Sequence, residues 1–305
     1  MHNRAMSGFS APDRIAASAD LSAGRDDALA MGAALHALLH PAPRERPEIP
    51  FMHRDRQLPF INLRGAVEHF LEFKRDKEKT REVFHIFETL PWRNVAERVR
   101  KFLATERGRQ IYLTEPSLPE ILDDHATLRR LPKDSFGYQY CDYMEREELT
   151  AAGLVAEYEE WRGGRPRLDD QIEWYNDRLR DTHDFLHFLN GFGRDTLGEQ
   201  CVLAFVFDQR PSPGHLALAY AGALTIRLSV PTRAPILRAV LEARRLGKGA
   251  LPIAEQSILE LLPMPTDAVR KKLRIRPATR YPEVRRMWDE EGITPNAVLA
   301  RPEAA

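Results

Sequence analysis

Cysteine is almost absent from this chain, whose 305 residues contain only Cys141 and Cys201. Two cysteines are too few for a disulfide framework or a cysteine-based zinc module, so a reducing compartment is the expected environment. Net charge is also lacking, because 45 basic residues balance 45 acidic ones. An even balance gives no broad basic surface for a phosphate backbone, so we expect no nucleic-acid partner.

Long hydrophobic runs are missing as well. A membrane-spanning helix needs about 20 apolar residues, and the longest candidate, 215–230, is shorter and contains His215 and Arg227. Residues 28–40 alone resemble the apolar part of a signal peptide, but acidic residues precede them where positive charge is expected. We therefore expect neither a membrane span nor a leader, and at most a peripheral membrane contact.

Helical periodicity is what the chain does contain. Apolar residues recur at steps of three and four from Leu63 onward, whereas the alternation typical of strands is scarce and brief. Helices are expected around 63–71, 83–90, 95–103, 147–161, 168–190, 197–207, 215–228, 235–246 and 253–262. The predicted fold is all-α, with one helical domain at 60–276. It lies between a partly mobile N-terminal extension at 1–59, with a short helix at 27–40, and a polar C-terminal tail at 277–305.

One short segment gathers residues suited to metal binding. On a helix, the side chains of His183, Asp184 and His187 occupy one arc of about 100°. The apolar stripe of the preceding residues runs into this arc, so the three side chains are expected to point into the core. A glycine-rich turn at 190–195 then lets the next helix bring Glu199 alongside. Imidazole and carboxylate groups are suitable ligands for a divalent metal such as zinc, which would offset the cost of burying them.

Simpler interpretations of this segment stay open at this point. His36 and His40 have the same spacing without a neighbouring acid, so a histidine pair alone is weak evidence. Thr196 and Glu199 fit a capping box, in which the glutamate bonds back to the start of its own helix. A satisfied polar network between two helices, without any metal, is the third alternative.

The wider pattern resembles a known family. The spacing His183-Asp184-x-x-His187, followed by eleven residues and Glu199, matches the signature of the fourth Coq protein family of ubiquinone (coenzyme Q) biosynthesis. Other segments are similar to further landmarks of that family: Leu131-Pro132-x-x-Ser135-Phe-Gly137-x-x-Tyr140, Arg107-Gly108-Arg109, Arg244-Arg245-x-Gly247-Lys248 and Val269-Arg270-x-x-Leu273-x-Ile275. The resemblance covers about residues 64–276, and the metal motif is its most specific part.

The chain also departs from the family pattern. Asp181 stands where the family usually has glutamate, and the segment after Glu199 lacks the usual lysine and glutamate. These departures put the substrate in doubt more than the metal site.

The resemblance implies an all-helical protein built around a buried divalent metal, usually taken as Zn²⁺ in this family, and associated with the inner membrane from the cytoplasmic side. His183, Asp184, His187 and Glu199 would be its ligands. The implied substrates are polyprenylated hydroxybenzoates, which lose or exchange the ring carboxyl group at C1. Arg178 and Arg180 would pair with that carboxylate, unless they are solvated surface charges. The apolar helix at 215–226 would line a tunnel for the isoprenoid tail, unless it is ordinary core.

Three functions follow from these observations. The favoured one is a metal-dependent carbon–carbon lyase that decarboxylates C1 of a polyprenylated 4-hydroxybenzoate, with or without oxidation. The alternative is a non-catalytic, lipid-binding organiser of a ubiquinone-biosynthesis complex, because four protein ligands would close a tetrahedral, structural site. An unrelated metallohydrolase is disfavoured by the matches outside the motif. Expected partners are the prenylated benzoate or phenol lipid, other ubiquinone-biosynthesis enzymes, the membrane surface and a second copy of the chain.

Overall fold

The computed structural model describes residues 36, 49–57, 59–75, 81–115 and 117–295. Every regular element within these ranges is a helix, and one isolated bridge between Ser135 and Pro265 is their only β-type pairing. The prediction of an all-α fold is confirmed. The helix expected at 27–40 lies outside the described residues except for His36, as does most of the extension at 1–59. None of the described helices is long and apolar enough to cross a membrane.

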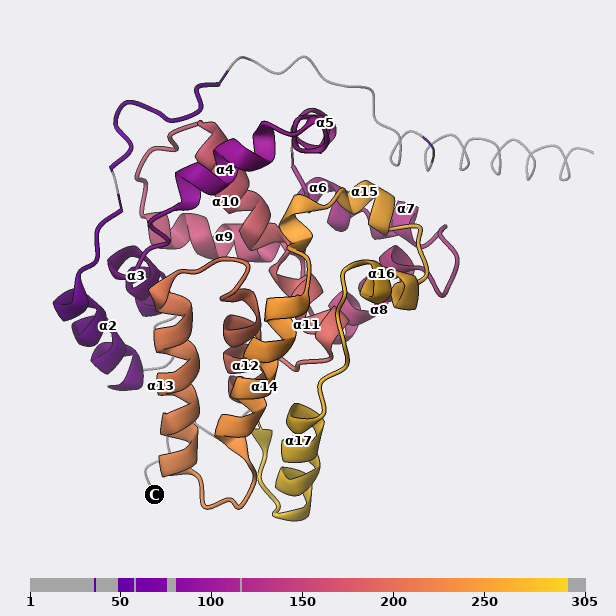
Figure 1. Ribbon diagram of the computed structural model, residues 1–305. Coiled ribbons are helices and arrows are strands. Elements are labelled where there is room, and N and C mark those ends of the chain that lie inside the picture. The colour runs from indigo at the N-terminus through magenta and orange to yellow at the C-terminus, as the bar shows by residue number, and fades with distance from the viewer. Residues whose placement is uncertain (1–35, 37–48, 58, 76–80, 116, 296–305) are drawn as a thin grey trace, which may run out of the picture.

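The helices follow one another through short connections (Figure 1). In the first half of the chain they are α2 (Leu63–Arg75), α3 (Arg81–Thr89), α4 (Val95–Leu103), α5 (Glu106–Thr114), α6 (Pro119–Leu122), α7 (His125–Leu128), α8 (Phe136–Arg146) and α9 (Ala151–Arg162). In the second half they are α10 (Gln171–Asp181), α11 (His183–Asn190), α12 (Thr196–Val206), α13 (Pro213–Ser229), α14 (Ile236–Gly249), η1 (Ile253–Glu255), α15 (Ile258–Leu261), α16 (Thr266–Lys272) and α17 (Arg280–Glu290).

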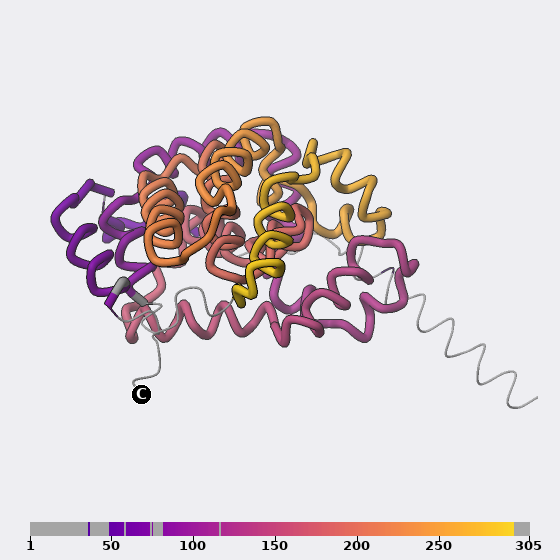
Figure 2. Tube along the Cα trace, turned by 90° about the horizontal axis from the view of Figure 1, so that it is seen from below, coloured from indigo at the N-terminus to yellow at the C-terminus, as the bar shows by residue number. Residues whose placement is uncertain are grey.

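Helix α12 lies at the centre of the main core. It is apolar along most of its length, and α13 and α14 pack against it (Figure 1). Figure 2, seen from below, shows α13, α14 and α17 side by side along one side of the molecule. The crossing of α12 and α14 is close, because a Cβ atom at Gly247 would lie 1.8 Å from the carbonyl oxygen of Phe205. Glycine is therefore required there.

The long helix predicted at 168–190 is two helices. α10 ends and α11 begins at Thr182, whose backbone (φ −93°, ψ 6°) leaves helical geometry. The Thr182 hydroxyl donates a hydrogen bond of 2.8 Å to the carbonyl of Arg178, which competes with regular helix bonding at that carbonyl. No glycine or proline marks this break, and the apolar periodicity continues through it, so the sequence pattern predicts one continuous helix. His183 and His187 nevertheless share one helix, α11.

The prediction of a polar C-terminal tail is wrong for residues 280–290. They form α17, which buries Tyr281, Val284 and Trp288 against the main core. These three residues are spaced by three and four, so they form one apolar stripe within an otherwise charged helix. The domain therefore extends past residue 276.

The N-terminal boundary also shifts. Arg56 donates two hydrogen bonds, of 2.5 and 2.6 Å, to the carboxylate of Asp170, and the carbonyl of Pro50 accepts one from the backbone nitrogen of Gln171. Phe51 packs against a second apolar cluster around Trp174. Residues 49–57 are thus attached to the start of α10, and the domain begins before residue 60.

Candidate metal centre

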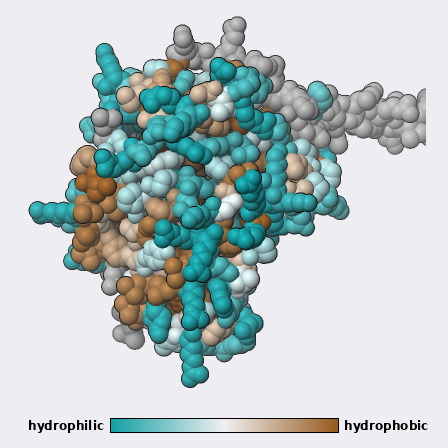
Figure 3. Space-filling model, viewed as in Figure 1, coloured by the Kyte–Doolittle hydropathy of each residue, from teal (hydrophilic) through white to brown (hydrophobic). Residues whose placement is uncertain are grey.

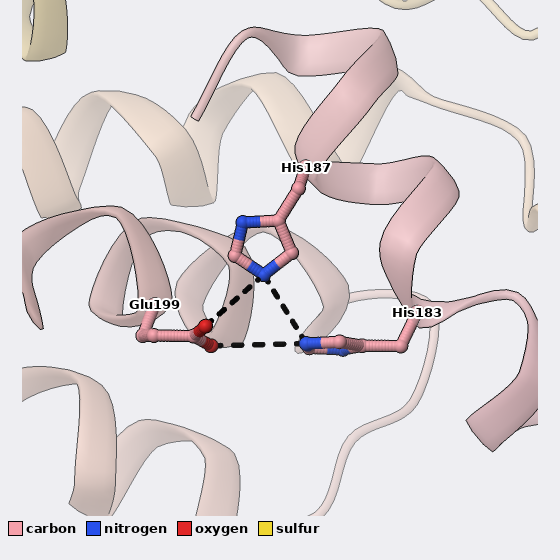
Figure 4. Close-up of side chains that lie close together, drawn as sticks. All are labelled: His183, His187 and Glu199. Atoms are coloured by element: carbon pink, nitrogen blue, oxygen red, sulfur yellow. Dashed lines mark hydrogen bonds and ion pairs between the residues drawn. The ribbon is translucent and has the colours of Figure 1, made fainter. Parts of the chain in front are cut away.

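Two histidines and a glutamate converge between α11 and α12 (Figure 4). His183 and His187 lie one turn apart on α11, and Glu199 lies in the first turn of α12. The Nε2 atoms of the two histidines are 3.2 Å apart. Glu199 places Oε1 3.4 Å from Nε2 of His187 and Oε2 3.7 Å from Nε2 of His183. One potential ligand atom of each side chain lies within 4.8 Å of the others.

The proton of His187 decides how these groups can interact. Its Nδ1 lies 3.2 Å from the carbonyl oxygens of both Phe192 and Gly193. A carbonyl only accepts, so Nδ1 carries the proton and donates it. In a neutral ring, Nε2 then offers a lone pair towards the second imidazole and towards a carboxylate. Two acceptors, this Nε2 and the carboxylate of Glu199, then face each other and repel unless a proton or a cation lies between them. Together with the imidazole of His183 this donor set fits a metal ion.

The charges of the cluster are strongly coupled. Burial alone would raise the pKa of Glu199, but the two neighbouring imidazoles outweigh it and hold that pKa well below its usual value. Burial alone would lower the pKa of His187, but the charge and hydrogen bond of Glu199, together with the charge of Asp184, outweigh burial and raise it. His187 is 1% exposed, whereas the side chains of His183 and Glu199 are 30% and 38% exposed. The cluster is therefore buried on the His187 side and open on the other.

The start of α12 fixes the position of Glu199. Asp195 caps this helix by accepting hydrogen bonds from the backbone nitrogens of Leu197 and Gly198. The capping box between Thr196 and Glu199 is therefore wrong: the cap is Asp195, and Glu199 faces the imidazoles. A Cβ atom at Gly198 would lie 1.8 Å from the carbonyl oxygen of Gly193, so glycine is needed where α12 approaches the preceding turn.

Helix α17 supports the same cap from outside the predicted domain. Tyr281 donates its hydroxyl proton to the carboxylate of Asp195, and Arg285 pairs with the same oxygen at 2.7 Å. The backbone nitrogen of Gly193 in turn donates to the Tyr281 hydroxyl at 2.9 Å. The turn that accepts the His187 proton is thus held by a residue almost 90 positions further along the chain.

Asp184 is not brought into this group of three. Its charge still acts on His187, whose pKa it helps to raise, and it also acts on Tyr140 and Tyr143 of α8: burial first and then Asp184 raise the pKa of both phenols. The structure therefore provides three of the four predicted ligands within mutual reach, and Asp184 lies near them without joining the group.

The two arginines predicted to bind substrate already have carboxylate partners. Arg178 is 2% exposed, pairs with Glu115 at 2.7 Å and donates to the carbonyls of Ala254 and Gln256. Arg180 pairs with Asp177 and Asp181 at 2.9 and 2.8 Å. Both charges therefore have a counter-ion within the protein, which favours a structural role for the two arginines, and their assignment to substrate binding stays a prediction.

A small cavity adjoins the open side of the cluster. It has a volume of about 30 Å³ and lies among α10, α11, α12, the start of α13 and residues 252–254. Its polar lining includes His183, Arg210 and His215. No sequence pattern marks Arg210 or His215 as residues of a site. In the remainder of the apolar helix at 215–226, four residues are buried in the core, Leu218, Ala219, Ala223 and Ile226, and the tunnel for the isoprenoid tail stays a prediction.

Comparisons with known proteins agree with the motif. The family model described as coenzyme Q (ubiquinone) biosynthesis protein Coq4 matches residues 77–279. The chain is 32% identical over 103 residues to a mitochondrial ubiquinone biosynthesis protein COQ4 homolog of Culex quinquefasciatus, covering 34% of this chain and 43% of that protein. It is 28% identical over 164 residues to the homolog of Aedes aegypti, covering 52% and 54%. The chain thus spans about half, or less, of the length of these relatives.

A solved structure shares the fold. A ubiquinone biosynthesis protein from Nostoc punctiforme superposes with a TM-score of 0.53 at 20% sequence identity, covering 71% of this chain and 100% of that chain. At this identity the likeness concerns the fold alone.

Proposed function

Because the chain belongs to the coenzyme Q (ubiquinone) biosynthesis protein Coq4 family, we propose that it is a metal-dependent lyase of that pathway. His183, His187 and Glu199 hold a divalent ion, for which Zn²⁺ is the first choice, and the substrate is a polyprenylated 4-hydroxybenzoate. The reaction removes the carboxyl group at C1. The bond between C1 and the carboxyl carbon breaks, CO₂ leaves, and the electron pair of the bond stays on C1, which takes up a proton.

The number of ligands carries this proposal. Two histidines and one glutamate are a ligand set that catalytic zinc sites use, with the fourth position left for water or substrate. A fourth protein ligand would close the site and favour a structural ion. Because Asp184 lies outside the group, the arrangement favours the enzyme over the non-catalytic organiser.

The protein's own residues have three tasks in this proposal. His187 keeps its proton on Nδ1, held by the two backbone carbonyls, so that Nε2 is available as a ligand. Leu186 and Val202 line the cavity beside His183 and keep water from the carboxyl group that is removed. When bound, the metal supplies Lewis-acid stabilisation of negative charge on a substrate oxygen.

The test is carboxyl release from a labelled substrate. Purified protein with Zn²⁺ is incubated with a short-tailed prenyl-4-hydroxybenzoate carrying ¹³C in its carboxyl group, and labelled CO₂ is measured. We expect turnover in the wild type and loss of at least about a hundredfold in His183→Ala, because a ligand and an orienting contact disappear together. His125→Ala, a histidine bound to a surface glutamate, is the matched control.

One outcome would turn the proposal into its alternative. If the lipid binds and zinc binds but no CO₂ appears, the chain is a lipid-binding organiser with a structural metal. The prenylated lipids that accumulate in a deletion strain give an independent answer, because the trapped compound identifies the blocked step.

We also propose that an exposed apolar face reaches the lipid at a membrane surface. Leu63, Val67 and Leu71 are 69%, 58% and 47% exposed and lie at steps of four along α2. Leu228, near the end of α13, is 77% exposed. Figure 3 shows apolar side chains gathered over the α2 side and over the lower end of α13. Clustered apolar side chains of this kind are typical of membrane or protein contact sites.

Vesicle flotation tests this contact. With phosphatidylcholine vesicles, we expect Leu63→Gln combined with Leu228→Gln to reduce the bound fraction several-fold, since each exposed leucine contributes its transfer free energy on insertion. Arg109→Gln on α5, a residue that is also exposed, is the control. Equal flotation of wild type and double variant would refute the assignment of this face.

A further inference from the structure

The cavity beside His183 contains a cation without a carboxylate partner. Arg210 follows the end of α12, and its Nε and Nη2 atoms donate to Nε2 of His215 at 3.1 and 2.8 Å. Within the described part of the chain, no carboxylate forms an ion pair with Arg210, whereas Arg178 and Arg180 both have one. Burial lowers the pKa of Arg210 to about 10, so it is still charged at neutral pH.

His215 cannot neutralise this charge. Its Nε2 accepts from Arg210 and so carries no proton, which places the single proton of the neutral ring on Nδ1. Burial, and then the charge of Arg210, lower the pKa of His215 well below its usual value. The ring therefore stays neutral and positions the guanidinium without compensating it.

The cavity has more donors than acceptors. Nδ1 of His215 and Nε2 of Gln209 are buried and have no hydrogen-bond partner among the described residues. Both residues line the same cavity as Arg210. Arg210 itself is half-buried. Buried donors are normally satisfied, and a guanidinium edge matches a carboxylate through two parallel N–H groups.

We propose that Arg210, held by His215, is the anion-binding residue of this cavity and takes the carboxylate of the substrate beside His183. This inference deepens the proposed function, on which it rests, and assigns to Arg210 the part that the sequence had given to Arg178 and Arg180. The free volume of about 30 Å³ accommodates a group of one or two waters' size, such as a carboxylate. The aromatic ring then lies outside this volume, against the half-buried Leu179 and Leu203, which also line the cavity.

The position of the charge gives it a role in selectivity. An anionic benzoate compensates the charge of Arg210, whereas a neutral ring with the same shape leaves that charge without a carboxylate partner. Selection therefore acts on the carboxylate itself. A product that has lost this group is released more readily than the substrate, because it no longer compensates Arg210.

The test compares two ligands that differ in charge. The affinities of 4-hydroxybenzoate and of the neutral 4-hydroxybenzyl alcohol are measured by ligand-observed NMR titration of the metal-free full chain. We expect wild type to prefer the benzoate by at least about tenfold, the size of one hydrogen bond to a charged group. In Arg210→Gln we expect this preference to disappear, so that the benzoate and the alcohol bind about equally, while the affinity for the alcohol stays the same. Arg180→Gln is the matched control and keeps the preference.

The measurement separates this inference from the proposed reaction. If the benzoate preference depends on Arg210 but no labelled CO₂ is released, the anion site stands and the lyase proposal fails. If Arg210→Gln binds both ligands as wild type does, the anion site is refuted whatever the activity. Should that variant not fold, Arg210→Lys replaces it: a selective loss of benzoate affinity supports the fork-shaped contact, and unchanged affinities for both ligands refute it.

Discussion

Gly198 is the position where one methyl group should weaken the metal centre. In Gly198→Ala the new Cβ would lie 1.8 Å from the carbonyl oxygen of Gly193 and 2.7 Å from its carbon. Real Cβ contacts are rarely below 3.0 Å, so α12 and the turn must separate by at least about 1.2 Å. Overpacking of this kind costs about 1–3 kcal/mol. The better helix propensity of alanine offsets about 1 kcal/mol of that cost.

The same movement should reduce metal affinity. The Gly193 carbonyl accepts the His187 proton, and Glu199 follows Gly198 directly, so the separation displaces two parts of the site in opposite directions. Loss of a contact that orients a ligand typically costs 10- to 100-fold in metal affinity. We therefore expect Zn²⁺ to bind Gly198→Ala about 10- to 100-fold more weakly, measured by competition with a chromophoric chelator.

Gly247→Ala provides a control with matched steric strain. Its Cβ would also lie 1.8 Å from a carbonyl oxygen, that of Phe205, but at the other end of α12. Urea unfolding should show comparable destabilisation of both variants, whereas zinc affinity should fall only in Gly198→Ala. If both variants bind zinc within about threefold of wild type, the coupling between the glycine turn and the site is refuted.

Three further outcomes are expected. The rise in melting temperature on adding Zn²⁺ should shrink between pH 7.5 and 5.5, because the raised pKa of His187 makes the proton compete with the metal, at about 1.4 kcal/mol per pH unit for one proton. Without metal the pH dependence of stability has the opposite sign, because protonated His187 then pairs with ionised Glu199. This pair stabilises the fold between about pH 4.5 and 6.5. The stabilisation is lost as pH rises through the His187 pKa or falls through that of Glu199. Glu115→Gln should lower the free energy of unfolding by about 3–5 kcal/mol, since it leaves Arg178 charged and buried, and a loss below about 1 kcal/mol in urea titration would contradict this. Tyr281→Phe should lower zinc affinity several-fold without changing helix content by circular dichroism; unchanged affinity would show that α17 does not support the site.

Sequence patterns predicted the features that depend on interactions between residues close together in the chain. The apolar period identified most helices, and the spacing of His183 and His187 placed both on one face of α11 because four residues make about one turn. The position of Glu199 beside the two histidines was predicted from the glycine-rich turn at 190–195 and from the family motif. The helix arc and the family motif both predict Asp184 as a ligand, but an arc of about 100° is wide enough to leave one of its side chains outside the group of three.

Long-range partners decided the remainder, and no local pattern contains them. Arg178 and Arg180 look alike in the sequence, yet Arg178 meets Glu115 from 63 positions away. Whether an arginine is neutralised depends on which distant helix faces it. Arg210 has no signal in the sequence for the same reason, because its place beside the cavity and its contact with His215 exist only in three dimensions.

The hydroxyl of Tyr281 has a practical consequence for anyone who shortens this chain. The family match ends at residue 279, one residue before α17 begins. A protein trimmed there would keep His183, His187 and Glu199 and still lose the residue that holds both the α12 cap and the Gly193 turn. Weak zinc binding by such a fragment would then reflect the cut and not the three side chains. For the same reason, one proteolytic cut at residues 276–280 would free α17 and loosen the cluster without touching it.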